Sequence, residues 1–183
     1  QKQHLELCRD IAQRFNSDFN APNFLKPPEP LIQKNFSRIM SLKDGTKKMS
    51  KSDPSDLSRI NLTDTKDQII NKIKKAKTDI MPMPSAKEGL KKRPEVENLL
   101  GIYSSLSNQN LEKSIDEFSG KNFSDFKVIL AEKVAEKISP ISKEIVNLLK
   151  NKDYIDKVLM EGAEKANIQA SKKVKEIKKI IGF

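Results

Sequence analysis

The spacing of apolar residues changes near residue 62, and this change constrains the fold more than any other feature of the sequence. Beyond it, apolar residues recur mainly at steps of three and four, which is the pattern of amphipathic helices. Thr65 and Gln68 have the spacing of a capping box in front of the first such segment. Pro94 suits the first turn of a later one. We therefore expect residues 63–183 to be helical.

The residues before this change predict a mixture of elements. Residues 1–16 carry apolar side chains at helical spacing, whereas four prolines between residues 17 and 37 do not permit a helix. Short apolar stretches at residues 37–42 and 60–62 predict two short strands, with Ile39 and Leu42 as candidates for burial. A polar, lysine-rich loop at residues 43–54 separates these strands.

Two details concern the later helices. We expect Ser124 to cap the helix that begins just after it, and Pro140 to interrupt this helix before it resumes. The last segment carries a narrow apolar stripe with small residues between Gly162 and Ala170, where another helix could approach closely.

The chain is strongly basic. Among its 183 residues, 35 are Lys or Arg and 25 are Asp or Glu, so the net charge is +10. The excess gathers at residues 43–51, 71–80 and 171–180, and such clusters suit either a polyanion such as RNA or a solvated helix face. No apolar run is long enough to span a membrane, and we expect no membrane partner. The single cysteine fits a reducing compartment, and no Cys/His spacing predicts a metal site.

The most informative segment is KKMSKSD at residues 47–53. It places three ammonium groups and two hydroxyls within six residues, between turn signals at Asp44-Gly45 and Asp53-Pro54. These donors suit a triphosphate, although the glycine pattern of a Walker loop is absent. Residues 48–52 read KMSKS, which resembles the second signature of class I aminoacyl-tRNA synthetases.

Further segments narrow the resemblance. Residues 1–16 and residues 38–54 are similar to tryptophanyl-tRNA synthetases of the bacterial and mitochondrial type, and residues 98–107 and 161–167 resemble helices of the same family. The resemblance implies a mostly α chain with two parts. Residues 1–62 would be the carboxyl-terminal remnant, with short strands, of a Rossmann-type nucleotide-binding domain that includes the KMSKS loop. Residues 63–183 would be a helical anticodon-binding domain.

The resemblance also implies a reaction. The family activates tryptophan with ATP and Mg²⁺, the metal being carried by ATP, and transfers it to tRNA. Lys48 and Lys51 would be catalytic, balancing charge on the phosphates as pyrophosphate leaves. The expected ATP contacts are Gln1, Ile39, Lys48, Met49, Ser50, Lys51 and Ser52. In these contacts Met49 would border the adenine, Ile39 would lie against the nucleotide, and Gln1 would lie at the edge of the site. The complete enzymes are homodimers, and we expect a cytoplasmic location.

Other parts of such an enzyme do not occur in this sequence. The first class I signature and most of a tryptophan pocket are missing, so we expect the 183 residues alone to make no adenylate. Three alternatives remain open: a non-catalytic basic helical RNA-binding module, another class I synthetase such as the tyrosyl enzyme, and a helical scaffold that pairs through its small-residue stripe.

Overall fold

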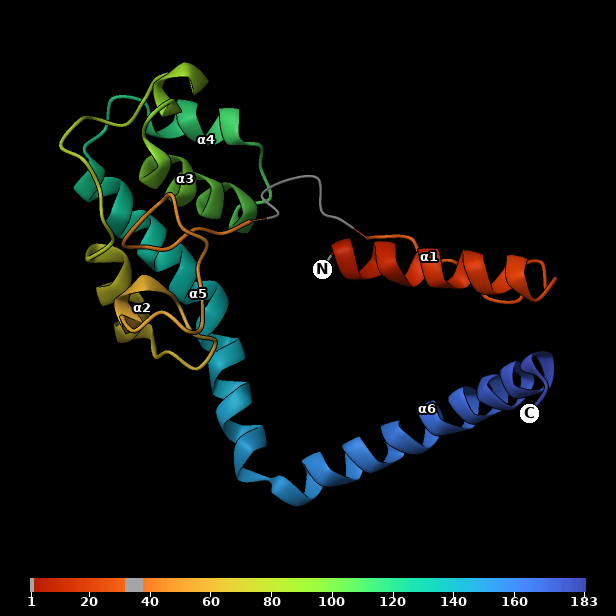
Figure 1. The fold of residues 1–183 in the computed structure, drawn as a ribbon. Coiled ribbons are helices and arrows are strands. Elements are labelled where there is room, and N and C mark those ends of the chain that lie inside the picture. The colour runs from red at the N-terminus through yellow and green to blue at the C-terminus, as the bar shows by residue number, and fades with distance from the viewer. Residues whose placement is uncertain (1, 32–37) are drawn as a thin grey trace. The chain divides into compact units, whose positions relative to one another are not determined.

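The computed structural model describes residues 2–31 and 38–183, and in this part the chain is mostly helical (Figure 1). The helices are α1 (Lys2–Asp18), α2 (Lys66–Lys74), α3 (Pro94–Leu106), α4 (Leu111–Phe118), α5 (Phe123–Lys150) and α6 (Lys152–Ile181). Two short 3-10 turns, η1 (Asp56–Ser58) and η2 (Lys87–Leu90), lie in the connections. No helix in the described part is both long and apolar enough to cross a membrane.

The chain divides into two compact units. The first contains Gln1–Ile32 with Lys152–Phe183, and the second contains Gln33–Asn151. The domain boundary expected near residue 62 falls inside the second unit. That boundary stays a prediction, because contacts within this chain do not by themselves define the domains of a synthetase.

The core of the second unit is built from α2, α3, α4 and α5. α5 packs against α2 and α3, and α4 packs against α3. The ring of Tyr103 meets that of Phe118 edge-on at 4.8 Å, and Phe118 meets Phe126 at 4.7 Å. Phe118 and Phe126 are only 1% and 0% exposed, and burying a phenylalanine side chain contributes roughly 1.5–3 kcal/mol. This cluster fixes the helices that carry the loop described below.

The predicted N-terminal signals of two helices, α2 and α3, are confirmed. The Thr65 hydroxyl accepts a hydrogen bond from the Gln68 backbone, and the Gln68 side chain accepts one from the Thr65 backbone. Pro94 occupies the first turn of α3. The prediction for Ser124 is wrong, because α5 already begins at Phe123 with Asn122 in the cap position.

The prediction that Pro140 interrupts α5 is also wrong, since the helix continues through it. A proline removes one backbone hydrogen bond, but packing on both sides can hold the helix together. Before the proline, Val134 and Ala135 are buried in the core. Beyond it, the Ser142 hydroxyl donates to the backbone oxygen of Asp64 at 2.9 Å.

The two short strands expected at residues 37–42 and 60–62 do not form within the described residues, which contain a single β-bridge between Met40 and Lys48. Residue 37 lies outside the described part. A β-strand needs a neighbouring strand along its length, whereas here single backbone groups form hydrogen bonds with different parts of the chain. The backbone N–H of Leu42 donates to the Ser58 carbonyl, and that of Asn61 donates to the Asp64 side chain. Of the two burial candidates, Leu42 is 2% exposed but Ile39 is 44% exposed.

In the first unit, α1 is followed by a compact turn. The Asn16 side chain donates to the Leu25 carbonyl at 2.8 Å and accepts from its N–H at 2.9 Å. The other helix, α6, contains no buried residue over its full length. A Cβ added at Gly162 would meet no atom within 4 Å, and every residue from Gly162 to Ala170 is exposed, so nothing in the described part of the chain covers the small-residue stripe.

Candidate functional site

The loop at residues 43–54, which we call the signature loop, is held at its start by α3. The Asn98 side chain donates to the Met40 carbonyl and accepts from the Met40 N–H, both at 2.9 Å. Asn98 is only 3% exposed, so these bonds form away from solvent. They satisfy the same two backbone groups that a neighbouring strand would satisfy. The start of the loop is therefore fixed to the helical core.

The first turn of the loop presses on the beginning of α3. Asp44 accepts hydrogen bonds from the hydroxyl and the N–H of Thr46 at 2.6 and 3.0 Å, and these bonds lower the pKa of Asp44. A Cβ on Gly45 would lie 2.6 Å from the backbone N of Glu95 and 2.6 Å from the carbonyl C of Pro94. Only glycine fits this close approach without moving the backbone.

The lysines of the KMSKS segment point to solvent. Lys48 and Lys51 are exposed, and neither forms an ion pair with another residue in the described ranges. Lys47, by contrast, lies 3.4 Å from Asp44. The hydroxyls of Ser50 and Ser52 are hydrogen-bonded to each other at 2.9 Å across the turn that presents Lys51. The loop thus offers two ammonium groups to an anion from outside the chain.

The other expected ATP contacts are distributed differently. Met49 is half-buried against the hydrophobic core, so its side chain anchors the loop in this structure. Ile39 pairs with Met49 through the backbone: the Ile39 carbonyl accepts a hydrogen bond from the Met49 N–H at 3.0 Å. Gln1 lies outside the described residues. Contact of these three residues with a nucleotide stays a prediction.

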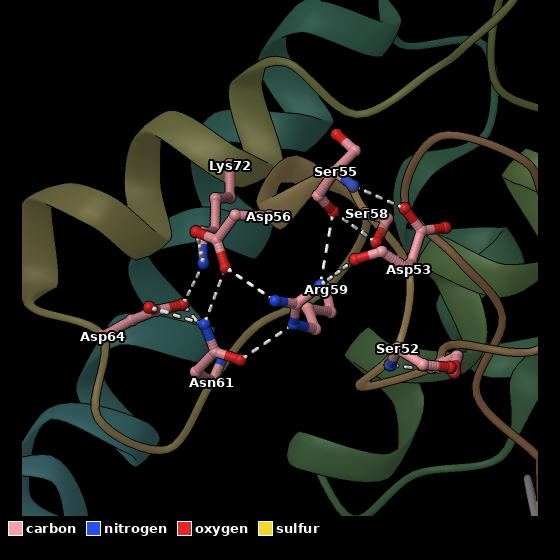
Figure 2. A network of polar contacts seen from close by, with 10 residues as sticks. Ser52, Asp53, Ser55, Asp56, Ser58, Arg59, Asn61, Asp64 and Lys72 are labelled. Atoms are coloured by element: carbon pink, nitrogen blue, oxygen red, sulfur yellow. Dashed lines mark hydrogen bonds and ion pairs between the residues drawn. The ribbon is translucent and has the colours of Figure 1, made fainter.

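The end of the loop is held by a polar network that sequence reasoning missed (Figure 2). Arg59 donates to the Asp53 carbonyl at 2.9 Å, and its guanidinium lies 3.3 Å from the Asp56 carboxylate. Lys72 of α2 lies 2.7 Å from Asp56 and 2.6 Å from Asp64. The partners of Arg59 all lie within six residues of it, but Lys72 reaches Asp56 and Asp64 from α2, and that contact is made only by the fold.

This network corrects the interpretation of one basic cluster. Lys72 is one of the lysines at residues 71–80, a cluster that the sequence predicts to suit a polyanion. It is 3% exposed and fully engaged with two carboxylates, so it cannot bind an external phosphate. Lys77 of the same cluster pairs with Glu95 at 2.9 Å. Burial raises the pKa of Glu95, but the hydrogen bond and charge of Lys77 and the backbone hydrogen bonds together outweigh it, so the pKa is lowered.

The acidic side chains described near the loop do not form a metal site. In the ranges that the structure describes, no three His, Cys, Asp or Glu side chains are placed to hold a metal ion. The donors present are ammonium groups, hydroxyls and backbone N–H groups, which fit the phosphates of a nucleotide.

Comparison with known proteins gives consistent matches. The profile of the family described as tRNA synthetases class I (W and Y) matches residues 1–143. The Tryptophan--tRNA ligase of Caulobacter vibrioides is 50% identical over 183 residues, covering 100% of this chain and 53% of that protein. The protein of the same name from Rickettsia conorii is 51% identical over 183 residues, covering 100% and 54%.

Solved structures agree. The crystal structure of tryptophanyl-tRNA synthetase from Mycoplasma pneumoniae has a TM-score of 0.82 and 30% identity, covering 100% of this chain and 54% of that one. The chain spans about half the length of the curated relatives it matches.

Proposed function

The chain belongs to the class I tRNA synthetases of the tryptophan and tyrosine group, and we propose that it is the carboxyl-terminal part of an enzyme that activates tryptophan with ATP and transfers it to tRNA. Relatives named for tryptophan, about 50% identical over the whole chain, favour this amino acid over tyrosine. They also favour an enzyme over an RNA-binding module or a scaffold. The observation that carries the proposal is the KMSKS segment, whose two unpaired lysines face solvent between two fixed ends.

The proposed chemistry is charge stabilisation. As the bond between the α- and β-phosphates breaks, negative charge grows on the departing pyrophosphate, and ammonium groups placed there lower the barrier. We assign this role to Lys48 and Lys51, with the hydroxyls of Ser50 and Ser52 as further donors. Mg²⁺ would enter with ATP. Closure of the loop over the nucleotide would bring these groups into place.

The remaining parts of the proposal follow from family membership. Residues 1–62 would complete a Rossmann-type nucleotide domain, with Ile39, Met49 and Gln1 beside the nucleotide. Residues 63–183 would bind the anticodon end of tRNA, which suits the basic clusters that stay exposed. The complete enzyme would be a cytoplasmic homodimer. The 183 residues alone would make no adenylate, because binding energy from the missing parts positions the substrates.

A chimeric enzyme tests the proposal. The 183 residues replace the aligned part of the Caulobacter vibrioides relative, and tryptophan-dependent exchange of pyrophosphate into ATP is measured, with tyrosine as the comparison. Lys51→Ala should lower kcat about 100-fold, as loss of a group that stabilises transition-state charge typically does. Lys113→Ala, on exposed α4 surface outside the basic clusters, is the control and should change little.

Two results would contradict the proposal. One is an active chimera whose exchange rate is insensitive to Lys51→Ala. The other is pyrophosphate exchange by the isolated 183 residues at the level of the chimera, which would refute the expectation that this part is inactive alone.

A further inference from the structure

The end of the signature loop is tied to two helices by one continuous set of polar contacts. We call this set the exit network and define it as Asp56, Arg59, Asn61, Asp64 and Lys72 (Figure 2). It begins at Asp53, the residue after KMSKS, and it reaches α2 through Lys72. It reaches α5 through Asp64, whose backbone oxygen accepts from the Ser142 hydroxyl at 2.9 Å.

Arg59 occupies the centre of this network. Its Nε donates to the Asn61 side-chain oxygen at 3.1 Å, and its Nη1 donates to the carbonyls of Asp53 at 2.9 Å and Ser55 at 3.4 Å. Its Nη2 lies 3.3 Å from Asp56. The flat guanidinium thus bridges the loop end on one side and a carboxylate on the other. A lysine cannot make this set of contacts, because it has one nitrogen on a flexible stem.

The partner carboxylate is in turn held from α2. Asp56 receives the Lys72 ammonium at 2.7 Å and the Asn61 amide at 3.0 Å. These contacts lower the pKa of Asp56, with the Lys72 hydrogen bond as the main cause. The Asp56 side chain is nevertheless 59% exposed, and exposed ion pairs add little to stability. The contact between Asp56 and Arg59 is therefore better explained by what it holds than by the stability it adds.

What it holds is the backbone that follows Lys51. Between Lys51 and the Arg59 contact on Asp53 there is only Ser52, whose hydroxyl is already bonded to Ser50. With the loop start fixed by Asn98, its middle by Met49 and its end by Arg59, movement is confined to the few residues between Met49 and Asp53. The position of the Lys51 ammonium then depends on the Arg59 contact.

We propose that Arg59 is a positioning residue for the activation step: it fixes the end of the signature loop so that Lys51 is held where charge develops on pyrophosphate. Arg59 touches no substrate in this scheme and acts through Lys51. The inference rests on the proposed function, since it assumes that Lys51 serves pyrophosphate release. It adds a residue outside KMSKS, together with the helices α2 and α5 that support it.

The test is a double-mutant cycle in the chimeric enzyme, with kcat expressed per active site. Arg59→Ala should lower kcat for pyrophosphate exchange about 10- to 100-fold, the effect of misplacing a catalytic group by about 1 Å, while KM for tryptophan stays within about twofold. In a Lys51→Ala background, the same change should lower kcat less than about threefold, because the group that Arg59 positions is gone.

Two further variants separate positioning from stability. Arg59→Lys keeps the charge but not the fork, and it should resemble Arg59→Ala rather than the parent. Arg93→Ala is the matched control. Arg93 also donates to a carboxylate, that of Asp79, and to two backbone carbonyls, those of Met81 and Pro82, but it donates nothing to the loop. It should leave kcat per active site unchanged and add to Lys51→Ala without coupling.

Amide hydrogen exchange gives a reading that does not need activity. Arg59→Ala should speed exchange in residues 50–58, whereas Arg93→Ala should not. Equal effects of Arg59→Ala with and without Lys51, or full activity of Arg59→Lys, would overturn the inference. A chimera insensitive to Lys51→Ala would instead count against the proposed function. Amide exchange tests Arg59 even in that case, because unchanged exchange in Arg59→Ala would refute its positioning role.

Discussion

Replacing Lys72 with Met should lower the unfolding free energy of the second unit by about 3–5 kcal/mol at neutral pH, the usual result of breaking a buried ion pair from one side. The change removes the ammonium group but keeps most of the aliphatic stem. Asp64 is 5% exposed and would keep its hydrogen bonds from Asn61 but lose its countercharge. Asp56 is 59% exposed on its side chain and can turn to water, so the cost falls on Asp64.

The chain offers a convenient reporter for this measurement. It has no tryptophan and two tyrosines, so a Tyr154→Phe background leaves Tyr103 as the only tyrosine. Tyr103 is 8% exposed and packs against Phe118 in the core of the second unit. Its fluorescence should therefore follow urea unfolding of that unit. For a slope of about 2 kcal/mol per molar urea, the midpoint should fall by about 1.5–2.5 M.

Two companion variants make the reasoning refutable. Asp56→Asn should shift the midpoint far less than Lys72→Met, because only an exposed partner is lost. The double variant Lys72→Met with Asp64→Asn should regain at least half of the lost stability, since no unpaired charge remains buried. If Lys72→Met costs no more than Asp56→Asn, or if the double variant is as unstable as the sum of the single changes, the assignment of the cost to Asp64 is wrong.

Two other predictions use the same urea assay. Gly45→Ala should cost about 1–3 kcal/mol, because its Cβ would meet immovable backbone; an unchanged midpoint would contradict the close approach. The hydrogen-bonded Arg93 guanidinium lowers the pKa of Asp79, so this pair stabilises fully above about pH 4 and the contribution is lost as the pH falls through the folded-state pKa. Arg93→Met should therefore show a shallower loss of stability between about pH 5 and 2.5, and an unchanged acid profile would exclude this role.

Features encoded by neighbouring residues were predictable from the sequence. The Thr65–Gln68 capping box and Pro94 in the first turn of α3 depend on contacts within three or four residues, and both are confirmed. The KMSKS motif is recognised directly from residues 48–52, and in the structure these residues are exposed apart from the half-buried Met49.

The rest depends on distant partners. Asn98 lies 58 positions from Met40, and only folding shows that its amide replaces a strand. From the sequence, Lys72 cannot be distinguished from a surface lysine, and only the packing of α2 buries it against Asp64. Pro140 predicts an interruption because the backbone hydrogen bond that it removes is evident from the sequence. The contact from Ser142 that holds α5 beyond the proline spans 78 positions and is not. Local rules describe a residue's preferences, whereas its burial is decided by the whole unit.

The absence of any buried side chain in α6 has a consequence for how the described chain melts. A helix without a fully buried side chain gains little cooperativity from a core, so its turns open more readily than those of a buried helix. Its backbone amides would then be labelled by heavy water long before those of α3, although both segments have the same regular geometry. Loss of helical signal on heating would accordingly come in two phases, a gradual one from α6 and a sharp one from the aromatic cluster around Phe126.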